Sequence, residues 1–336
     1  MLKSTVRAAA AAAVMPAAIV AVVAAGCWPA GAARAQPGEW PVKTVRIVLP
    51  FAPGGGTDFL TRALAQRLAE QLGQPFVVDN RPGAGGNIGA EMVAKGPIDG
   101  YTWMVSTASV AVNVTLYPKA AFDARKDLLP VTQLASAPIL IAVHPSVPVR
   151  NLKELVALSR RTKGGLNYGS NGIGTASHLA GVMLGQTTGA QLTHVAYKGA
   201  GPAVTALLGG EIEIAFPAVN TVAGFVRTGK LRGLAVTTAR SSSLFPDVPT
   251  VAAQFPGFDI DNWFMMFARS SMPPALIERL YAEVVKAMQH PEMKSFVARE
   301  GAEPVVSRPA EAAAFFQREI DKFARIIQQA GIKVDN

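Results

Sequence analysis

The chain contains 336 residues, of which 50% are hydrophobic and 16% charged, and it includes 31 glycines, 24 prolines and a single cysteine. The charged fraction lies below the roughly 25% of ordinary soluble domains, which argues against an intrinsically disordered chain. The one cysteine, Cys27, excludes an internal disulfide framework and a four-cysteine zinc site. The length suits about two domains, each with its own core. A formal net charge of +9 leaves nucleic acid, an anionic membrane or acidic ligands open as partners.

Residues 1–35 have the pattern of a secretory signal peptide. Two basic residues precede an apolar stretch over 8–26, and Ala33-Arg34-Ala35 supplies the small residues that signal peptidase requires. A membrane-spanning helix is the alternative, because an apolar stretch of 19 residues nearly crosses a bilayer. Alanine is only weakly hydrophobic and Pro16 interrupts a helix, so the pattern favours export.

The position of cleavage decides the fate of Cys27. The segment Ala24-Ala25-Gly26-Cys27 resembles a weak lipoprotein box without its usual leucine, and cleavage there would leave a lipid-anchored cysteine. We favour cleavage after Ala35, which removes the only thiol. This cleavage also removes three basic residues and no acidic ones, so the formal net charge falls from +9 to +6.

Residues 40–142 alternate short apolar strands with helical patterns. Strands are predicted at Val45–Leu49, Phe76–Val78, Tyr101–Val105 and Ile139–Val143, and helices at Leu60–Leu72 and Gly86–Lys95. Leucines recur every four residues through the first helix, which Gly73 closes. The spacing of about 30 residues between successive strands predicts βαβ units and a parallel sheet.

A second alternation follows over 143–262. It consists of strands at Leu166–Tyr168, Leu192–Ala196, Ile212–Ala215 and Leu231–Val236, with helices that begin at Leu152, Ser177, Ala203 and Val222. One more strand is predicted at Trp263–Ala268, and the remainder to Ala330 is helical with breaks at Pro291 and Pro304. Because this tail has too few strands for a third unit, we expect 263–336 to fold back onto the first.

The predicted fold class is therefore α/β with two lobes. Residues 36–142 plus 263–336 form the first lobe and residues 143–262 the second, with crossovers near His144 and Asp261. Two crossovers permit hinge closure over a cleft.

Two glycine-rich loops, Pro50–Asp58 and Gly169–Thr175, each follow a strand and open a helix, one in each lobe. Their glycines let the backbone approach a ligand, and the first amides of a helix form an anion site. Ligands of open α/β sheets bind at the carboxyl ends of strands, so both loops are expected to face the cleft. The alternative is that each loop is only a tight turn that needs glycine for positive φ.

Several residues near these loops have two interpretations. Arg81–Gly89 and Tyr197–Pro202 are further glycine-rich stretches, and Lys198 is either an anion contact or a solvated surface residue. Asp58 either caps the first helix or meets an ammonium or hydroxyl group of the ligand. His178 either donates to a ligand or is a capping or core histidine.

Enzymatic, metal-binding and nucleic-acid-binding functions have little support. Gly54-x-Gly56-x-x-Phe59 lacks the third glycine of a dinucleotide fingerprint, and Gly169-Ser170-Asn171-Gly172 does not match a nucleophile elbow. Aromatic residues do not interleave with basic ones, as they do in many nucleic-acid-binding proteins. No metal-ligand spacing links the four histidines, which are His144, His178, His194 and His290. We therefore expect no cofactor, no metal and no nucleic-acid partner.

Five motifs occur in order along the chain: W-P-x-K-x-V-R-I-V-L-P-F-A-P-G-G-G-x-D at 40–58, V-V-D-N-R-P-G-A-G-G-N-I-G at 77–89, N-Y-G-S-N-G-I-G-T-A-S-H-L at 167–179, Y-K-G-A-G-P-A at 197–203 and V-P-T at 248–250. Together they resemble the Bug family, the substrate-binding receptors of tripartite tricarboxylate transporters. The resemblance spans almost the whole mature chain. It implies a type II periplasmic binding protein fold that closes on a small mono-, di- or tricarboxylate or an amino acid, without catalysis.

The resemblance also implies a periplasmic location, an inner-membrane permease as partner and recognition of the ligand carboxylate by backbone amides and small polar side chains. We expect the receptor to be a monomer. Together with His178 from the second loop region, the expected ligand-binding residues are Phe51, Ala52, Gly54, Gly55, Gly56, Thr57, Asp58, Ser106, Thr107, Ser170, Asn171, Gly172, Gly174 and Thr175.

One segment departs from the family pattern. Residues 268–273 read A-R-S-S-M-P where the family commonly shows A-P-x-G-T-P, so the identity of the ligand stays open. Two other functions remain as alternatives. One is an exported α/β enzyme, either a hydrolase or nicotinamide-dependent, that uses the same cleft. The other is a sensor that presents its ligand to a signalling protein.

Overall fold

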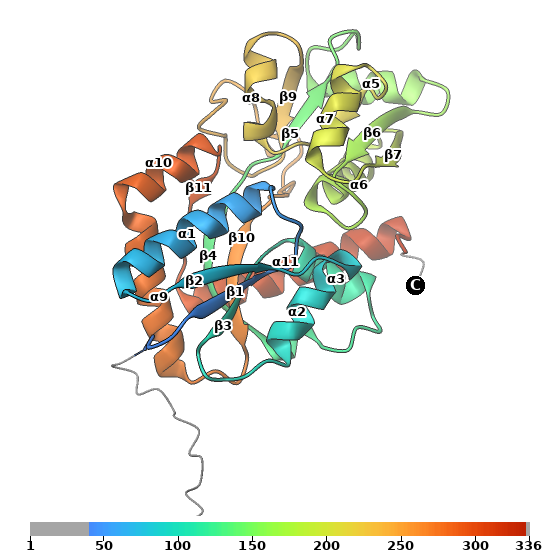
Figure 1. The fold of residues 1–336 in the computed structure, drawn as a ribbon. Helices are drawn as coiled ribbons and strands as arrows, with labels where there is room; N and C mark the ends of the chain where they lie inside the picture. The colour runs from blue at the N-terminus through green and yellow to red at the C-terminus, as the bar shows by residue number, and fades with distance from the viewer. Residues whose placement is uncertain (1–39, 334–336) are drawn as a thin grey trace, which may run out of the picture. The chain divides into compact units, whose positions relative to one another are not determined.

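A computed structural model describes residues 40–333, which form two β-sheets surrounded by helices (Figure 1). The leader expected at 1–35, its cleavage site and Cys27 lie outside the described residues. In spatial order the first sheet contains β11 (Glu303–Pro304), β4 (Leu128–Ser136), β10 (Phe264–Arg269), β3 (Thr102–Thr107), β1 (Val45–Leu49) and β2 (Phe76–Asn80). The second contains β7 (Leu192–Ala196), β6 (Leu166–Ser170), β8 (Ile214–Ala215), β5 (Leu140–Val143) and β9 (Arg232–Val236).

Helices cover both faces of the first sheet (Figure 1). They are α1 (Gly56–Leu72), η1 (Ala84–Gly86), α2 (Asn87–Ala94), α3 (Ser109–Leu116), α4 (Ala124–Asp127), α9 (Pro274–Gln289), α10 (Pro291–Arg299) and α11 (Pro309–Ala330). Ile47 and Leu49 point into a core shared with α1 and α9, whereas Val48 points into one shared with α2, α3 and α11. This alternation follows from the two-residue period of a strand.

The second sheet is accompanied by four α-helices and one short 3₁₀ turn. They are α5 (Leu152–Arg161), α6 (Ala176–Thr188), α7 (Ala200–Leu208), α8 (Val219–Arg227) and η2 (Val251–Ala253). The C-terminal helix α11 touches this part as well, because Gln186 of α6 donates a hydrogen bond to the carbonyl of Ile326 at 3.2 Å. Within residues 40–333, no helix combines the length and the hydropathy needed to cross a membrane.

Most of the glycine-rich loops follow parallel strands. In the first sheet β1 pairs in parallel with both β2 and β3, and in the second β6 pairs in parallel with β7 and β8. The first sheet is mixed rather than wholly parallel, because β10 runs antiparallel to β3 and β4. Strand β10 is the one with which the chain returns to the first sheet from the second.

The chain changes sheets earlier than expected. The strand predicted at Ile139–Val143 was assigned to the end of the first lobe, but β5 pairs with β8 and β9 in the second sheet. The first crossover therefore lies between Ser136 and Leu140, before this strand, and the chain returns between Val236 and Phe264. It stays a prediction that two lobes, residues 36–142 plus 263–336 and residues 143–262, move as units.

Strand β4 and helix α3 are the longest elements of the first sheet region that the sequence did not predict. Strand β4 contains Pro130, which usually argues against a strand in the middle of a sheet. Pro130 pairs with Phe267 of β10 on one side, and β11 pairs only with Ala135 and Ser136, so the other side of β4 is an open edge at Pro130. Proline is tolerated in strands at such edges. Helix α3 is rich in β-branched residues and is buried around most of its surface, so it lacks an amphipathic pattern.

Asp261 ties the two crossover segments together. Its carboxyl accepts hydrogen bonds from Ser136 Oγ at 2.5 Å and from the amide of Ala137 at 3.2 Å. Burial, aided by the neighbouring carboxylates of Asp259 and Glu319, raises the pKa of Asp261 to about 7. The Ser136 hydrogen bond and the ammonium of Lys322 oppose this rise without cancelling it.

This raised pKa predicts a pH-dependent contribution to stability. The unfolded pKa is 3.8 and the folded one about 7, so the contribution of Asp261 is complete below the first value and is lost as the pH rises through the second. As the pH rises from 4 to 7, we expect Asp261→Asn to become more stable relative to the unchanged protein, by at most about 1.4 kcal/mol per pH unit. Urea unfolding at intervals across this range measures the difference, and a difference independent of pH would contradict the prediction.

Candidate functional site

A cavity of about 550 Å³ is lined by loops from both sheets. The beginnings of five helices contribute to it, and each of these helices follows a parallel strand. The lining residues at these helix starts include Gly56 of α1, Ser109 of α3, Ala176 of α6, Ala200 of α7 and Asn220 of α8. The first amides of a helix have no partner within the helix and carry the positive end of its dipole. The cavity is thus bordered by five groups of hydrogen-bond donors suited to an anion.

The lining is otherwise almost uncharged. Among the described residues that line the cavity, Glu300 is the one charged side chain, and no lysine, arginine or histidine takes part. Lys198, considered above as an anion contact, is not among them. Small polar groups, among them the side chains of Thr107, Asn171 and Asn262, supply further hydrogen-bonding capacity. An anion here is therefore met by amides and hydroxyls rather than by an opposite charge.

The structure brings together just over half of the residues expected to bind a ligand. Those that line the cavity are Phe51, Gly54, Gly55, Gly56, Thr57, Thr107, Asn171 and Thr175. Those that do not are Ala52, Asp58, Ser106, Ser170, Gly172, Gly174 and His178. A role of the first group in binding stays a prediction.

Other lining residues were not among those expected. Ser109, Asn262 and Glu300 lie outside every glycine-rich loop, as does the start of α8 at Ala218–Thr221. The start of α7 at Gly199–Gly201 belongs to the fourth glycine-rich stretch, which could have been included on that signal.

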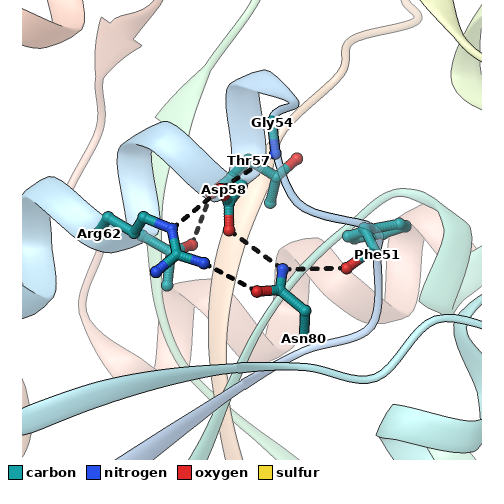
Figure 2. A network of polar contacts seen from close by, with 7 residues as sticks. Phe51, Gly54, Thr57, Asp58, Arg62 and Asn80 are labelled. Carbon is teal, nitrogen blue, oxygen red and sulfur yellow. Dashed lines mark hydrogen bonds and ion pairs between the residues drawn. The ribbon is translucent and has the colours of Figure 1, made fainter.

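Asp58 braces the first glycine-rich loop, in the sense that its hydrogen bonds hold the loop backbone in place (Figure 2). Its carboxylate is 3% exposed and accepts hydrogen bonds from the amide of Gly54 at 3.1 Å and from Arg62 Nε at 3.0 Å. Asn80 donates to the same carboxylate at 3.0 Å and to the carbonyl of Phe51 at 3.1 Å. These contacts favour an internal bracing role over contact with a ligand ammonium or hydroxyl group.

The environment of Asp58 favours its ionised form. Burial is the largest influence and opposes ionisation, but the hydrogen bonds from Arg62, Asn80 and Gly54 together outweigh it and lower the pKa of Asp58 below 3.8. The carboxylate is therefore available to hold the loop at neutral pH.

Removal of the Asp58 carboxylate is expected to destabilise this loop. Asp58→Ala removes the acceptor of the Gly54 amide and one of the acceptors of each of the Arg62 and Asn80 side chains, at a cost of about 1–3 kcal/mol in the free energy of unfolding. Glu91→Ala, which removes a surface ion pair with Lys95 on α2, is the matched control and should change stability by less than about 0.5 kcal/mol. Equal losses in the two variants, measured by urea unfolding, would rule out the bracing role.

The second glycine-rich loop is held by the buried His178 and the half-buried His194. His178 Nδ1 accepts a hydrogen bond from the amide of Gly174 at 3.2 Å, which requires this nitrogen to be unprotonated. Its ring stacks on that of His194, with 4.0 Å between ring centroids. Ser170 Oγ lies 2.6 Å from His194 Nε2. The structure thus favours the positioning interpretation of His178 over donation to a ligand.

Glycine is required at position 174 of this loop. Gly174 has a φ of +77°, and a Cβ there would lie 2.8 Å from Leu116 Cδ2 of α3. Two small hydroxyl groups complete the loop: Thr175 Oγ1 donates to the carbonyl of Gly172 at 2.7 Å, and Ser177 Oγ accepts from the amide of Asn171 at 2.9 Å. Within residues 40–333, no three His, Cys, Asp or Glu side chains are grouped so as to hold a metal ion.

The buried His178 predicts acid sensitivity. Burial, with a smaller effect from His194, lowers the pKa of His178 from 6.5 to about 3. The stability that the neutral ring contributes is complete above pH 6.5 and is lost as the pH falls toward 3. His178→Asn retains an acceptor for Gly174 but does not titrate, so its stability should fall less steeply than that of the unchanged protein between pH 6.5 and 4. Parallel stability curves from urea unfolding at each pH would refute this assignment.

Known proteins resemble this chain along nearly its whole length. The model of the family described as tripartite tricarboxylate transporter family receptor matches residues 60–332. Protein BugT of Bordetella pertussis is 34% identical over 306 residues, which cover 90% of this chain and 94% of BugT.

Solved structures share the fold as well as the sequence. A structure described as that of a periplasmic transporter has 35% identity and a TM-score of 0.78, and the match covers 88% of this chain and all of that one. The structure of R. palustris Rpa4515 with adipate has 33% identity and a TM-score of 0.79, and the match covers 88% of this chain and 99% of that one.

Proposed function

Because this chain belongs to the tripartite tricarboxylate transporter receptor family, and so is a solute receptor with the two-sheet fold of periplasmic binding proteins, we propose that its ligand is a small carboxylate held in the 550 Å³ cavity. The observation that carries the proposal is the convergence of five helix N-termini on a cavity with no basic side chain among its described lining residues. Such a lining suits an anionic group that is bound through amides. Members of this family are transport receptors and not enzymes, so the ligand leaves unchanged.

Amide recognition supplies enough free energy for a receptor. A micromolar dissociation constant corresponds to about −8 kcal/mol, and each hydrogen bond to a charged group contributes about 1.5–3 kcal/mol. About four to six such contacts therefore suffice after the cost of association, without an arginine or lysine. Gly55, Gly56 and Thr57 at the start of α1, with Asn171 and Thr175 from the second sheet, are the contacts we propose.

A relative gives the ligand class its chemical precedent. Rpa4515 was solved with adipate, a six-carbon dicarboxylate, and shares 33% of its sequence with this chain. The cavity volume of about 550 Å³ falls within the range of about 300–1,000 Å³ usual for small-molecule sites.

The same membership supports a proposal for the location and partner of the receptor. We propose that residues 1–35 direct export and are removed, that the receptor acts in the periplasm as a monomer, and that it delivers its ligand to an inner-membrane permease. The supports are the basic and apolar leader with its Ala33-Arg34-Ala35 tripeptide and the transporter components that the family description names. The two sheets, joined by two crossovers, are proposed to act as lobes that close over the ligand.

Two substitutions at Gly56 test amide recognition directly. Gly56 is the first residue of α1, where proline is compatible with the helix, and Gly55 before it is extended with φ −92° and ψ 168°. A Cβ at position 56 meets no atom within 4 Å, so Gly56→Pro removes one N–H and adds no clash at Cβ. We expect Gly56→Pro to bind about 10- to 100-fold more weakly, whereas Gly56→Ala, which keeps the N–H, binds as the unchanged protein does.

The measurement is isothermal titration of residues 36–336 with whichever of adipate, hexanoate and 6-aminohexanoate binds the unchanged protein most tightly. Native mass spectrometry of protein purified without refolding provides an independent reading, because a bound carboxylate adds its mass. Equal affinities of the proline and alanine variants would show that this amide does not bind the carboxylate. The absence of any bound carboxylate in both experiments would overturn the proposed function.

A further inference from the structure

Glu300 places a negative charge in a cavity otherwise suited to anions. It is the residue at the C-terminal end of α10, and its side chain lines the cavity. Its Oε2 accepts a hydrogen bond from Asn220 Nδ2, near the start of α8, at 3.3 Å. Among residues 40–333, no lysine, arginine or histidine nitrogen lies within 4.0 Å of this carboxylate. The described part of the protein therefore leaves the charge of Glu300 without a counter-charge.

Packing fixes the position of Glu300. The next residue, Gly301, has a φ of +64°, and a Cβ there would lie 2.6 Å from Leu244 Cδ1 and 2.9 Å from Asn220 Cβ. The turn after α10 therefore lies directly against the second-sheet region, with no space for a side chain. Glu300 is held at the cavity by this close approach of two backbones and by its bond to Asn220.

Two helix ends act on the Glu300 carboxylate with opposite signs. The C-terminus of α10 carries the negative end of its dipole and disfavours a carboxylate, whereas Asn220, which donates to Oε2 of Glu300, lies at the start of α8, where the positive end of that dipole favours one. The cavity thus contains two environments: amides at helix N-termini, which favour an anion, and Glu300 at a helix C-terminus, which favours a cation. The lining also includes the apolar side chains of Leu60, Phe264 and Val297, which suit a short hydrocarbon chain.

We propose that Glu300 determines specificity by selecting carboxylates that also carry a cationic nitrogen, that is, amino carboxylates. The inference rests on the proposed function, since it concerns which carboxylate that site accepts. The ligand carboxylate binds the helix N-termini, and the ligand ammonium pairs with Glu300. A dicarboxylate of the same length brings a second negative charge toward Glu300 and is disfavoured.

Matched ligands separate charge from size. 6-Aminohexanoate, adipate and hexanoate form one set, and 4-aminobutanoate, succinate and butanoate form a shorter one. In each set the first two differ mainly in the sign of the terminal charge. For the better-fitting length, isothermal titration of residues 36–336 should show the amino carboxylate binding at least about 10-fold more tightly than the dicarboxylate, a difference of about 1.4 kcal/mol.

The variant Glu300→Gln removes the charge and keeps the shape. It should weaken the amino carboxylate by about 10-fold, tighten the dicarboxylate, and leave the monocarboxylate within about threefold. The unchanged monocarboxylate affinity reports that the variant is folded. Glu292→Gln is the control, because Glu292 lies on the same helix with 84% of its side chain exposed and does not line the cavity. Its ligand preference should equal that of the unchanged protein.

Other results would overturn the role of Glu300, and one of them would also overturn the proposed function. A preference for the dicarboxylate in the unchanged protein, or a preference unaltered in Glu300→Gln, overturns the role of Glu300 and leaves the receptor function intact. Equal binding of 6-hydroxyhexanoate and 6-aminohexanoate also overturns it, because a neutral hydroxyl would then bind Glu300 as well as an ammonium does. If neither set binds but native mass spectrometry finds another carboxylate, this inference fails and the proposed function stands. If no carboxylate is found at all, both fail.

Discussion

The constraint on which this structure depends is that a helix cannot satisfy its own first amides. Parallel strands require helical returns, and the helices that follow β1, β3, β6, β7 and β8 all begin at the carboxyl edge of their sheets. Their unsatisfied N–H groups gather there as a consequence of topology. In this chain five helix starts border one cavity, so the anion site that we propose would arise from the fold itself rather than from basic side chains.

Polar side chains near the cavity divide into those that line it and those that hold the lining in place. Asp58 and His178 look like ligand contacts in the sequence because each lies in a helix-opening segment. The structure turns both toward the backbone, where each accepts a loop amide, that of Gly54 and that of Gly174. A loop built for amide recognition must have a fixed conformation, and buried acceptors supply it. Candidate residues chosen by type and position therefore mix the two roles.

The sequence was sufficient for the fold class, which comparison with known structures confirms, and for the two main glycine-rich loops. Periodicity failed where tertiary context decides: β4 carries Pro130 at an open edge, and α3 is buried on nearly every side. The sheet to which β5 belongs depends on pairing with β8 and β9, which lie far along the chain. Glu300 and Asn220 reach the cavity only through packing between α10 and α8, and no local pattern marks such an encounter.

A cavity lined mainly by neutral donors also has a consequence for the receptor without its ligand. A cluster of lysines or arginines would repel itself when vacant and would bind counter-ions that a ligand must then displace. Amides and hydroxyls carry no net charge, and water can form hydrogen bonds with them when the solute departs. Release of a bound solute would therefore leave no buried cation without a counter-charge. Among the described lining residues, only Glu300 departs from this neutrality.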